Sequence, residues 1–341
     1  MCLVLAFVAN ASATRLQDNL FGTKAVSPQQ AWVVGNFGSI YVTSDGGKTW
    51  EPQDSGTKMP LFGVDFADAT HGWIVGQTGI ILRTTDGGVS WTPQTSPVPG
   101  GKHFFNVAAV DRDTAWVVGD WGAIATTSDG GNTWKDASLG TLVVEEIDSP
   151  ARTLQVVTDD VILYDVSFID EQHGAIAGEF GTVLLTDDGG TTWRRVNTGT
   201  DKTLFGVDFV SAMEGWAVGI DGLVLHTSDR GESWEVQRGI IERSDIGELS
   251  FSQAMENPGL YAVRVEDRFG VVVGDTGTLL VSRDGGQTWA RRELPGKDRL
   301  LWLRDVSLVS GSLGFLAGAE GLTATVSDGS ILARGATAGG E

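Results

Sequence analysis

Short apolar segments separated by Gly-rich turns recur along the whole chain. The stretch from residue 61 shows four of them in succession: LFGVDF (61–66), HGWIVG (71–76), GIILRT (79–84) and WTPQTS (91–96). Segments of this length, rich in Val, Ile, Phe and Trp and bounded by turn residues, are typical of β-strands. None has the long 3.6-residue apolar period of a helical repeat. The pattern therefore predicts a repeating unit of four short strands.

An eight-residue motif marks the turn between the third and fourth strands of each unit. It reads TSDGGKTW at 43–50 and recurs at 84–91, 127–134, 186–193, 227–234 and 282–289. A decayed seventh copy, VSDGSILA, begins at Val326. A G-x-x-G pair precedes every copy, and its first Gly lies ten residues before the motif Asp. Successive motif Asp residues are 41, 43, 59, 41, 55 and 44 positions apart. A period of roughly 40–45 residues is that of a four-stranded propeller blade.

The repeat predicts an all-β fold, a seven-bladed β-propeller of four-stranded antiparallel blades, formed by a single domain over residues 14–341. The expected blades cover residues 20–56, 61–99, 103–140, 162–200, 203–239, 260–295 and 301–334. NLFGTKAV (19–26) supplies the first strand of blade one, and ILAR (331–334) supplies the last strand of blade seven. No strand exchange between these two blades is visible, although residues 14–19 could add an edge strand.

Each residue type in the motif suits a tight turn. Asp favours such turns because its carboxylate accepts hydrogen bonds from backbone N–H groups one or two residues later. The Gly pair supplies positive φ, and the Trp begins the outer strand with a large apolar face to bury. The motif resembles the Asp-box of bacterial neuraminidase repeats, and this resemblance implies a structural role away from any catalytic centre. The structural Asp-box residues are then Asp45, Asp86, Asp129, Asp188, Asp229 and Asp284.

Composition narrows the possible functions. A net charge of −20 argues against nucleic acid and anionic membrane surfaces as partners. The only cysteine is Cys2, so no intrachain disulfide is possible. The apolar start MCLVLAFVANASA has the apolar and cleavage regions of a secretory signal without its basic start. We expect residues 1–13 to be a signal-peptide remnant and the mature protein to be exported to the periplasm or the lumen side of a membrane, without a membrane span. An apolar first strand is the alternative interpretation of this segment.

No catalytic constellation is apparent in the sequence. The G-x-S-x-G elbow is absent, and GGKT (46–49) lacks the earlier Gly and the helix of a phosphate loop. His71 and His173 occupy the same repeat position, which indicates turn residues and not a metal cluster. The arginine and tyrosine set of a sialidase is not recognisable. We therefore expect no enzyme activity, no cofactor and no metal. A carbohydrate-active enzyme or glycan-binding module of the neuraminidase-repeat type is the alternative, and a structural module of a cell-envelope complex is a third hypothesis.

One face of the propeller is the predicted binding side. Connections in an antiparallel blade alternate between its two ends, so the G-x-x-G loops share a face with the links between blades and the Asp boxes lie on the other. The long links after Trp134 and Trp234 both open onto the G-x-x-G face. Residues between the paired glycines are the candidate contacts with a protein partner: Phe37, Asp120, Trp121, Glu179, Phe180, Asp221, Asp275 and Glu320. Trp121 is the candidate anchor, since exposed Trp is enriched among interface hot spots. Purely polar turns are the alternative interpretation.

The combined pattern also resembles a known family. HGWIVGQTGIILRTTDGGVSW (71–91) carries the likeness best, and it extends over about residues 20–334. The pattern is similar to the photosystem II stability/assembly factor family. That resemblance implies a seven-bladed, non-enzymatic scaffold on the lumenal or periplasmic side that holds intermediates of a membrane-protein complex. It also implies a basic, arginine-bearing surface, whereas five G-x-x-G loops of this chain carry a carboxylate.

Overall fold

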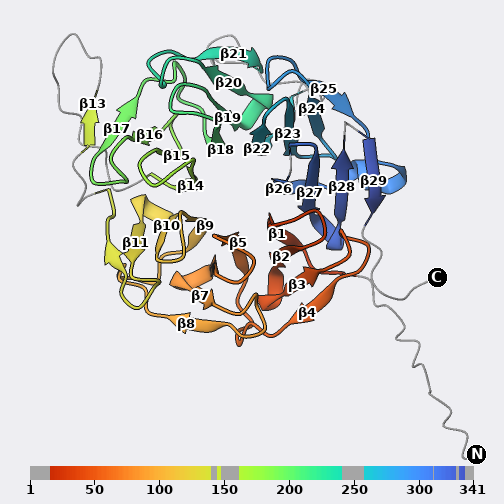
Figure 1. The fold of residues 1–341 in the computed structure, drawn as a ribbon. Coiled ribbons are helices and arrows are strands. Elements are labelled where there is room, and N and C mark those ends of the chain that lie inside the picture. The colour runs from red at the N-terminus through yellow and green to blue at the C-terminus, as the bar shows by residue number, and fades with distance from the viewer. Residues whose placement is uncertain are drawn as a thin grey trace, which may run out of the picture.

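Seven separate β-sheets surround a central axis in the computed structural model, which describes residues 16–139, 144–146, 161–239, 257–309, 311–327 and 330–334. The first strand of each sheet lies next to the axis and the fourth lies at the periphery (Figure 1). The prediction of a seven-bladed β-propeller is confirmed.

Blades one to three follow the order of segments expected from the sequence. Blade one contains β1 (Leu20–Ala25), β2 (Ala31–Gly35), β3 (Ile40–Thr43) and β4 (Glu51–Gln53). Blade two contains β5 (Leu61–Phe66), β6 (Gly72–Gly76), β7 (Ile81–Thr84) and β8 (Thr92–Gln94). Blade three contains β9 (Phe104–Ala109), β10 (Thr114–Gly119), β11 (Ile124–Ser128) and β12 (Lys135–Asp136).

Blades four to seven repeat the same arrangement. Blade four contains β14 (Leu163–Phe168), β15 (Gly174–Gly178), β16 (Val183–Thr186) and β17 (Trp193–Val196). Blade five contains β18 (Leu204–Phe209), β19 (Gly215–Gly219), β20 (Val224–Thr227) and β21 (Glu235–Arg238). Blade six contains β22 (Leu260–Glu266), β23 (Phe269–Gly274), β24 (Leu279–Ser282) and β25 (Ala290–Arg292). Blade seven contains β26 (Leu303–Val309), β27 (Leu313–Gly318), β28 (Thr323–Ser327) and β29 (Ser330–Arg334).

Blade four has a fifth strand that the sequence did not predict. β13 (Val144–Glu146) pairs in parallel with β17, with Val144 opposite Trp193. The outer strand of a blade leaves a row of unpaired backbone groups, and an extended segment of the long link satisfies them. The rest of this link and most of the second long link, residues 240–256, lie outside the described residues.

The hydrophobic core lies between neighbouring blades. One cluster joins Trp32 and Val34 of blade one to Leu61 and Phe66 of blade two. The rings of Trp32 and Phe66 stack with their centroids 3.8 Å apart, and Trp32 is fully buried. Because each blade buries both of its faces against its neighbours, its second strand is apolar along its whole length and not alternating.

The ring closes without a shared strand, as the sequence indicated. Each terminal sheet contains only strands of its own blade in the described part of the chain. The segment Leu16–Asn19 does not add an edge strand; it crosses from blade seven to blade one as coil. The backbone N–H of Gly321 donates to the carbonyl of Asp18 at 2.8 Å, and the buried Leu16 packs with Phe315. Residues 14–15 lie outside the described residues, and so does the expected signal-peptide remnant.

Candidate protein-binding site

The Asp boxes are closed turns whose hydrogen-bonding groups are satisfied internally. The Thr49 N–H donates to the Asp45 carboxylate at 2.9 Å, and the Thr49 hydroxyl donates to its second oxygen at 2.6 Å. The Thr43 hydroxyl accepts the N–H of Gly47 at 2.9 Å. The expectation of bonds one or two residues later was wrong: the Gly pair reverses the chain, so that the N–H groups three and four residues later point at the carboxylate.

The same network recurs in the other boxes. The N–H four residues later donates to each of Asp86, Asp129, Asp188, Asp229 and Asp284. The bond from the Thr133 hydroxyl lowers the pKa of Asp129 to about 2, and the bond from the Thr288 hydroxyl does the same for Asp284. Carboxylates that already accept this many bonds have little capacity left for a ligand. The geometry therefore supports the structural role that the sequence predicts for them.

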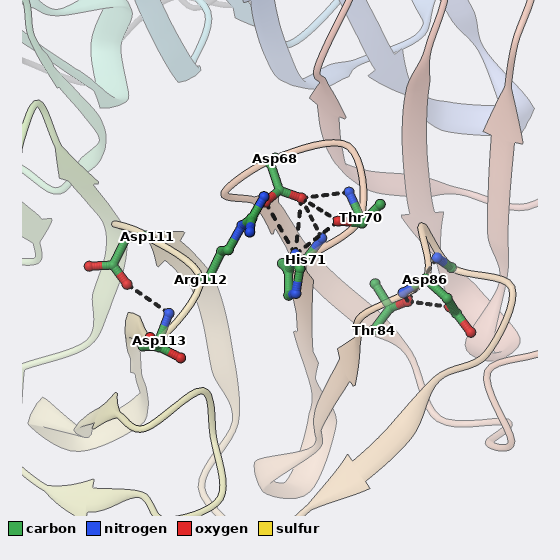
Figure 2. Close-up of polar contacts among 9 residues, drawn as sticks. Asp68, Thr70, His71, Thr84, Asp86, Asp111, Arg112 and Asp113 are labelled. Atoms are coloured by element: carbon green, nitrogen blue, oxygen red, sulfur yellow. Dashed lines mark hydrogen bonds and ion pairs between the residues drawn. The ribbon is translucent and has the colours of Figure 1, made fainter.

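The repeated histidines belong to similar turns on the Asp-box face. Figure 2 shows Asp68 accepting bonds from the N–H and Oγ1 of Thr70 and from the N–H of His71. Arg112 of blade three reaches the same carboxylate with its Nε at 2.5 Å, which ties blades two and three together. Burial favours the neutral form, but these bonds outweigh it and lower the pKa of Asp68. His173 and Asp170 repeat the arrangement in blade four. Among the described residues, no group of three or more His, Cys, Asp or Glu side chains is placed to hold a metal ion.

The G-x-x-G loops carry the predicted contact residues on the opposite face. Five of them form single 3₁₀ turns: η1 (Asn36–Gly38), η2 (Gln77–Gly79), η3 (Asp120–Gly122), η4 (Ile220–Gly222) and η6 (Ala319–Gly321). η5 (Gly296–Leu300) lies in the link before blade seven. The first Gly of a loop is required because a Cβ on Gly35 would lie 2.1 Å from the carbonyl oxygen of Asn19. The residue before the second Gly has a left-handed backbone in all seven loops, with φ between 50° and 59°.

Three of these left-handed positions hold large aromatic residues that are exposed. Phe37 is 72% exposed, Trp121 is 54% exposed and Phe180 is 61% exposed. A left-handed backbone costs a non-Gly residue roughly 1–2 kcal/mol. Packing within the fold does not offset this cost, because the rings point into solvent. These three aromatic residues are therefore the part of the predicted set that is best placed to contact a partner.

The carboxylates of the predicted set are mostly engaged inside the fold. Asp120 accepts the N–H of His103 at 3.0 Å, and Glu179 accepts the N–H of Ile162 at 3.1 Å. In both cases the carboxylate caps the residue just before the first strand of its own blade. The remaining acids divide into two kinds. Asp221 pairs with Lys202 and Asp275 accepts the hydroxyl of Tyr261, whereas the side chain of Glu320 is exposed.

A ring of aromatic side chains surrounds the mouth of the central channel on this same face. The second residue of each first strand contributes to it: Phe21, Phe62, Phe105, Tyr164, Phe205, Tyr261 and, in blade seven, Arg304. Neighbouring ring centroids from Phe21 round to Tyr261 lie 4.9–5.6 Å apart. Trp302 completes the circle by stacking on Phe21 at 5.8 Å. All of these side chains are half-buried and together line a cavity of about 250 Å³.

Polar side chains of the first strands link neighbouring blades deeper in the channel. Asp165 of blade four accepts the N–H of Val207 at 3.0 Å, and Asp208 of blade five accepts the N–H of Val265 at 2.7 Å. Arg264 lies 3.2 Å from Asp165 and neutralises it. Burial raises the pKa of Asp208 to about 6, although Arg264 favours the ionised form. The channel thus has an aromatic mouth and a charged interior.

The sequence and the fold both connect this chain with known proteins. The profile of the family described as Photosynthesis system II assembly factor YCF48 matches residues 50–144 and 143–240, more than half of the chain. The chain belongs to this family. The profile of the BNR/Asp-box repeat matches residues 41–52. No curated protein matches the sequence.

Solved structures of this family, and of an unrelated enzyme, have the same fold as this chain. The structure titled "YCF48 bound to D1 peptide" is 22% identical, covers 93% of this chain and 96% of that chain, and has a TM-score of 0.67. YCF48 from Cyanidioschyzon merolae is 23% identical, with 93% and 99% covered and a TM-score of 0.66. A GH74 xyloglucanase from Xanthomonas campestris is 14% identical, with 93% and 53% covered and a TM-score of 0.63. Identities this low indicate a shared fold only.

The aromatic ring is the feature that sequence reasoning missed in this family member. The segments LFGTKA, LFGVDF and LYAVRVE each carry an aromatic residue at the second position of a first strand. An aromatic residue at that position in six of seven blades was the available signal. Within the described residues, no helix is long and apolar enough to cross a membrane.

Proposed function

We propose that this protein is an exported, non-catalytic assembly scaffold that binds a polypeptide segment of a membrane-protein complex, photosystem II in particular. The binding side is the face that carries the G-x-x-G loops and the channel mouth. The observation that carries the proposal is the gathering of exposed aromatic residues there: Phe37, Trp121 and Phe180 on the loops, and the half-buried ring around the channel. Aromatic side chains with little conformational freedom are the usual anchors of protein interfaces.

Two further points support this function. A family member of the same fold has been solved with a D1 peptide bound, so a polypeptide ligand is compatible with this scaffold. The acidic residues of the repeat are engaged in their own turns, and this leaves the Asp boxes no evident catalytic role. The proposal includes residues 1–13 as an export signal remnant and residues 14–341 as one mature domain, placed on the lumen or periplasmic side of a membrane.

The test uses overlapping peptides that together cover the D1 sequence, with binding measured by calorimetry. We compare the wild type with a Trp121→Ala/Phe180→Ala double variant. The control is Val89→Ala, which removes an 86% exposed apolar side chain from the opposite, Asp-box face. We expect at least one peptide to bind wild type and control equally, and to bind the double variant at least about tenfold more weakly. Equal binding to the double variant would place the interface elsewhere, and no binding of any D1 peptide would contradict the photosystem II assignment.

A further inference from the structure

Two arginine side chains, Arg264 and Arg304, line the channel-mouth cavity beside the aromatic ring, and only Arg264 has an ion-pair partner among the described residues. Arg304 occupies the position that an aromatic residue fills in the other six blades. Its guanidinium lies 4.4 Å from the ring centroid of Tyr261 and 5.8 Å from that of Phe205. Arg304 therefore takes the place of a seventh aromatic residue, and its cationic guanidinium packs against the rings of Tyr261 and Phe205.

Arg264 lies on the preceding first strand, three positions after Tyr261, and provides the internal comparison. Its guanidinium bonds the Asp165 carboxylate at 3.2 Å and the carbonyl oxygens of Val207 and Val263 at 3.2 and 2.8 Å. A guanidinium removed from water in this way requires such partners, because burying an unpaired charge is costly.

Within the described part of the chain, Arg304 has no comparable hydrogen bond or ion pair: its guanidinium packs on the two aromatic rings, and the charges of Asp305 and Asp275 act on it without a direct bond. The carboxylate nearest in sequence, Asp305, is directed elsewhere: its oxygens accept the N–H groups of Thr23 at 2.8 Å and Val306 at 2.8 Å. A guanidinium has five N–H donors in a planar fork that matches a carboxylate. The donors of Arg304 thus remain available at the wall of a cavity that is aromatic at its mouth and charged deeper inside, where Asp165, Arg264 and Asp305 also line it.

We infer that the channel mouth binds one large apolar side chain of a partner polypeptide, with a carboxylate next to it on the same segment held by Arg304. This inference rests on the proposed function and specifies the chemistry of the bound segment. The aromatic ring excludes water from the apolar side chain, and the planar fork of the guanidinium donates two charge-assisted hydrogen bonds to the carboxylate. The carboxylate comes from an Asp or Glu side chain or from a chain end, and the experiment separates these two sources.

The experiment uses short peptides with both ends blocked and the full-length protein. The first probe is Gly-Gly-Phe-Asp-Gly-Gly. Two comparison peptides have Ala in place of Phe or Asn in place of Asp. A further probe lacks Asp and ends in Phe with a free carboxylate. A p-benzoylphenylalanine version of the first probe is photo-crosslinked and its attachment points are mapped by mass spectrometry. We expect attachment to residues of the aromatic ring, and a loss of affinity of about tenfold or more when either Phe or Asp is replaced.

The variants separate the role of Arg304 from general damage. In Arg304→Gln, we expect the Asp and Asn peptides to bind equally weakly, whereas Arg291→Gln on the outer strand of blade six behaves as wild type. In Arg304→Glu, a peptide with Lys in place of Asp binds better than the original, a gain that an unfolded variant cannot show. If the free-acid probe binds wild type better than the Asp probe, the carboxylate comes from a chain end; the reverse order assigns it to a side chain.

Two results would overturn the inference while leaving the proposed function in place. One is attachment of the photo-probe outside the channel mouth. The other is equal binding of the Asp and Asn peptides to wild type. In either case a D1 peptide that still depends on Trp121 and Phe180 would keep the G-x-x-G face as the binding side. If neither the D1 peptides nor the short probes bind, the proposed function itself is contradicted.

Discussion

Asp305 of blade seven accepts a hydrogen bond from the backbone N–H of Thr23 of blade one at 2.8 Å, across the seam where the two ends of the chain meet. Two positions further along each strand, Ser307 accepts the N–H of Ala25 at 3.0 Å. These side chains satisfy donors on the free inner edge of the first sheet. The propeller therefore closes through side chains in the channel and not through a strand shared between its first and last blades.

Removing the Asp305 carboxylate is expected to weaken this seam. Asp305→Ala leaves the N–H of Thr23 without its acceptor, and the free energy of unfolding should fall by about 1–3 kcal/mol. Urea denaturation followed by tryptophan fluorescence measures the change. Glu51→Ala, on the outer strand of blade one, is the matched control for loss of an exposed carboxylate. An unchanged midpoint in Asp305→Ala would show that the seam does not depend on this bond.

Stability is expected to decrease as the pH rises from about 5 to about 6 and to level off above about 7. Burial raises the pKa of Asp208 to about 6 and that of Asp305 to about 6. A carboxyl group whose pKa is higher in the folded than in the unfolded chain stabilises the fold when protonated, and this contribution is lost as the pH passes the folded-state value. The Asp-box carboxylates, whose pKa values are lowered, stay ionised throughout this range and contribute no slope.

Asp208 is the more buried of the two groups and should dominate the effect. Asp208→Asn is therefore expected to flatten the dependence of unfolding free energy on pH, while retaining a side-chain acceptor for the N–H of Val265. Denaturation curves at several pH values between about 5 and about 7.5 test this. A wild-type stability that increases with pH over this range would contradict the assignment.

The Asp-box turn depends on its first Thr as well as on its Asp. Thr43 is 1% exposed, and its hydroxyl accepts the N–H of Gly47 at 2.9 Å. Thr43→Val keeps the shape and leaves that N–H without its partner, so we expect a loss of about 1–3 kcal/mol. Thr43→Ser retains the hydroxyl and should recover most of the stability. Equal losses in both variants would point to the methyl group as the important part.

Trp121 is expected to lower stability in the free protein. Its backbone has φ 54°, and more than half of its side chain is exposed. Asn tolerates the left-handed conformation, so Trp121→Asn should keep or raise the free energy of unfolding, by up to about 1 kcal/mol. The same variant should bind D1 peptides more weakly than wild type. Paired stability and binding measurements on one preparation test both statements, and a stability loss without a binding loss would assign Trp121 to packing.

The sequence by itself determined the number of blades, the order of their strands and the place of the six intact Asp-box turns. These features are local: a short apolar run, a Gly with positive φ and an Asp that accepts nearby N–H groups act within a few residues, and repetition makes the signal strong. Only the tertiary structure decided which of the predicted loop residues have side chains free to contact a partner. The carboxylate of Asp120, for example, accepts the backbone N–H of His103 and so contributes to the fold.

The channel site depended on the tertiary structure for a further reason. Phe21 and Trp302 stack although the chain between them runs through six blades. Within one first strand, an aromatic residue that packs on the next blade looks the same as one that faces the axis, because both surfaces are buried or half-buried. Closure of the ring brings the second residues of seven strands to one opening, and a pattern read one segment at a time cannot reveal that they meet.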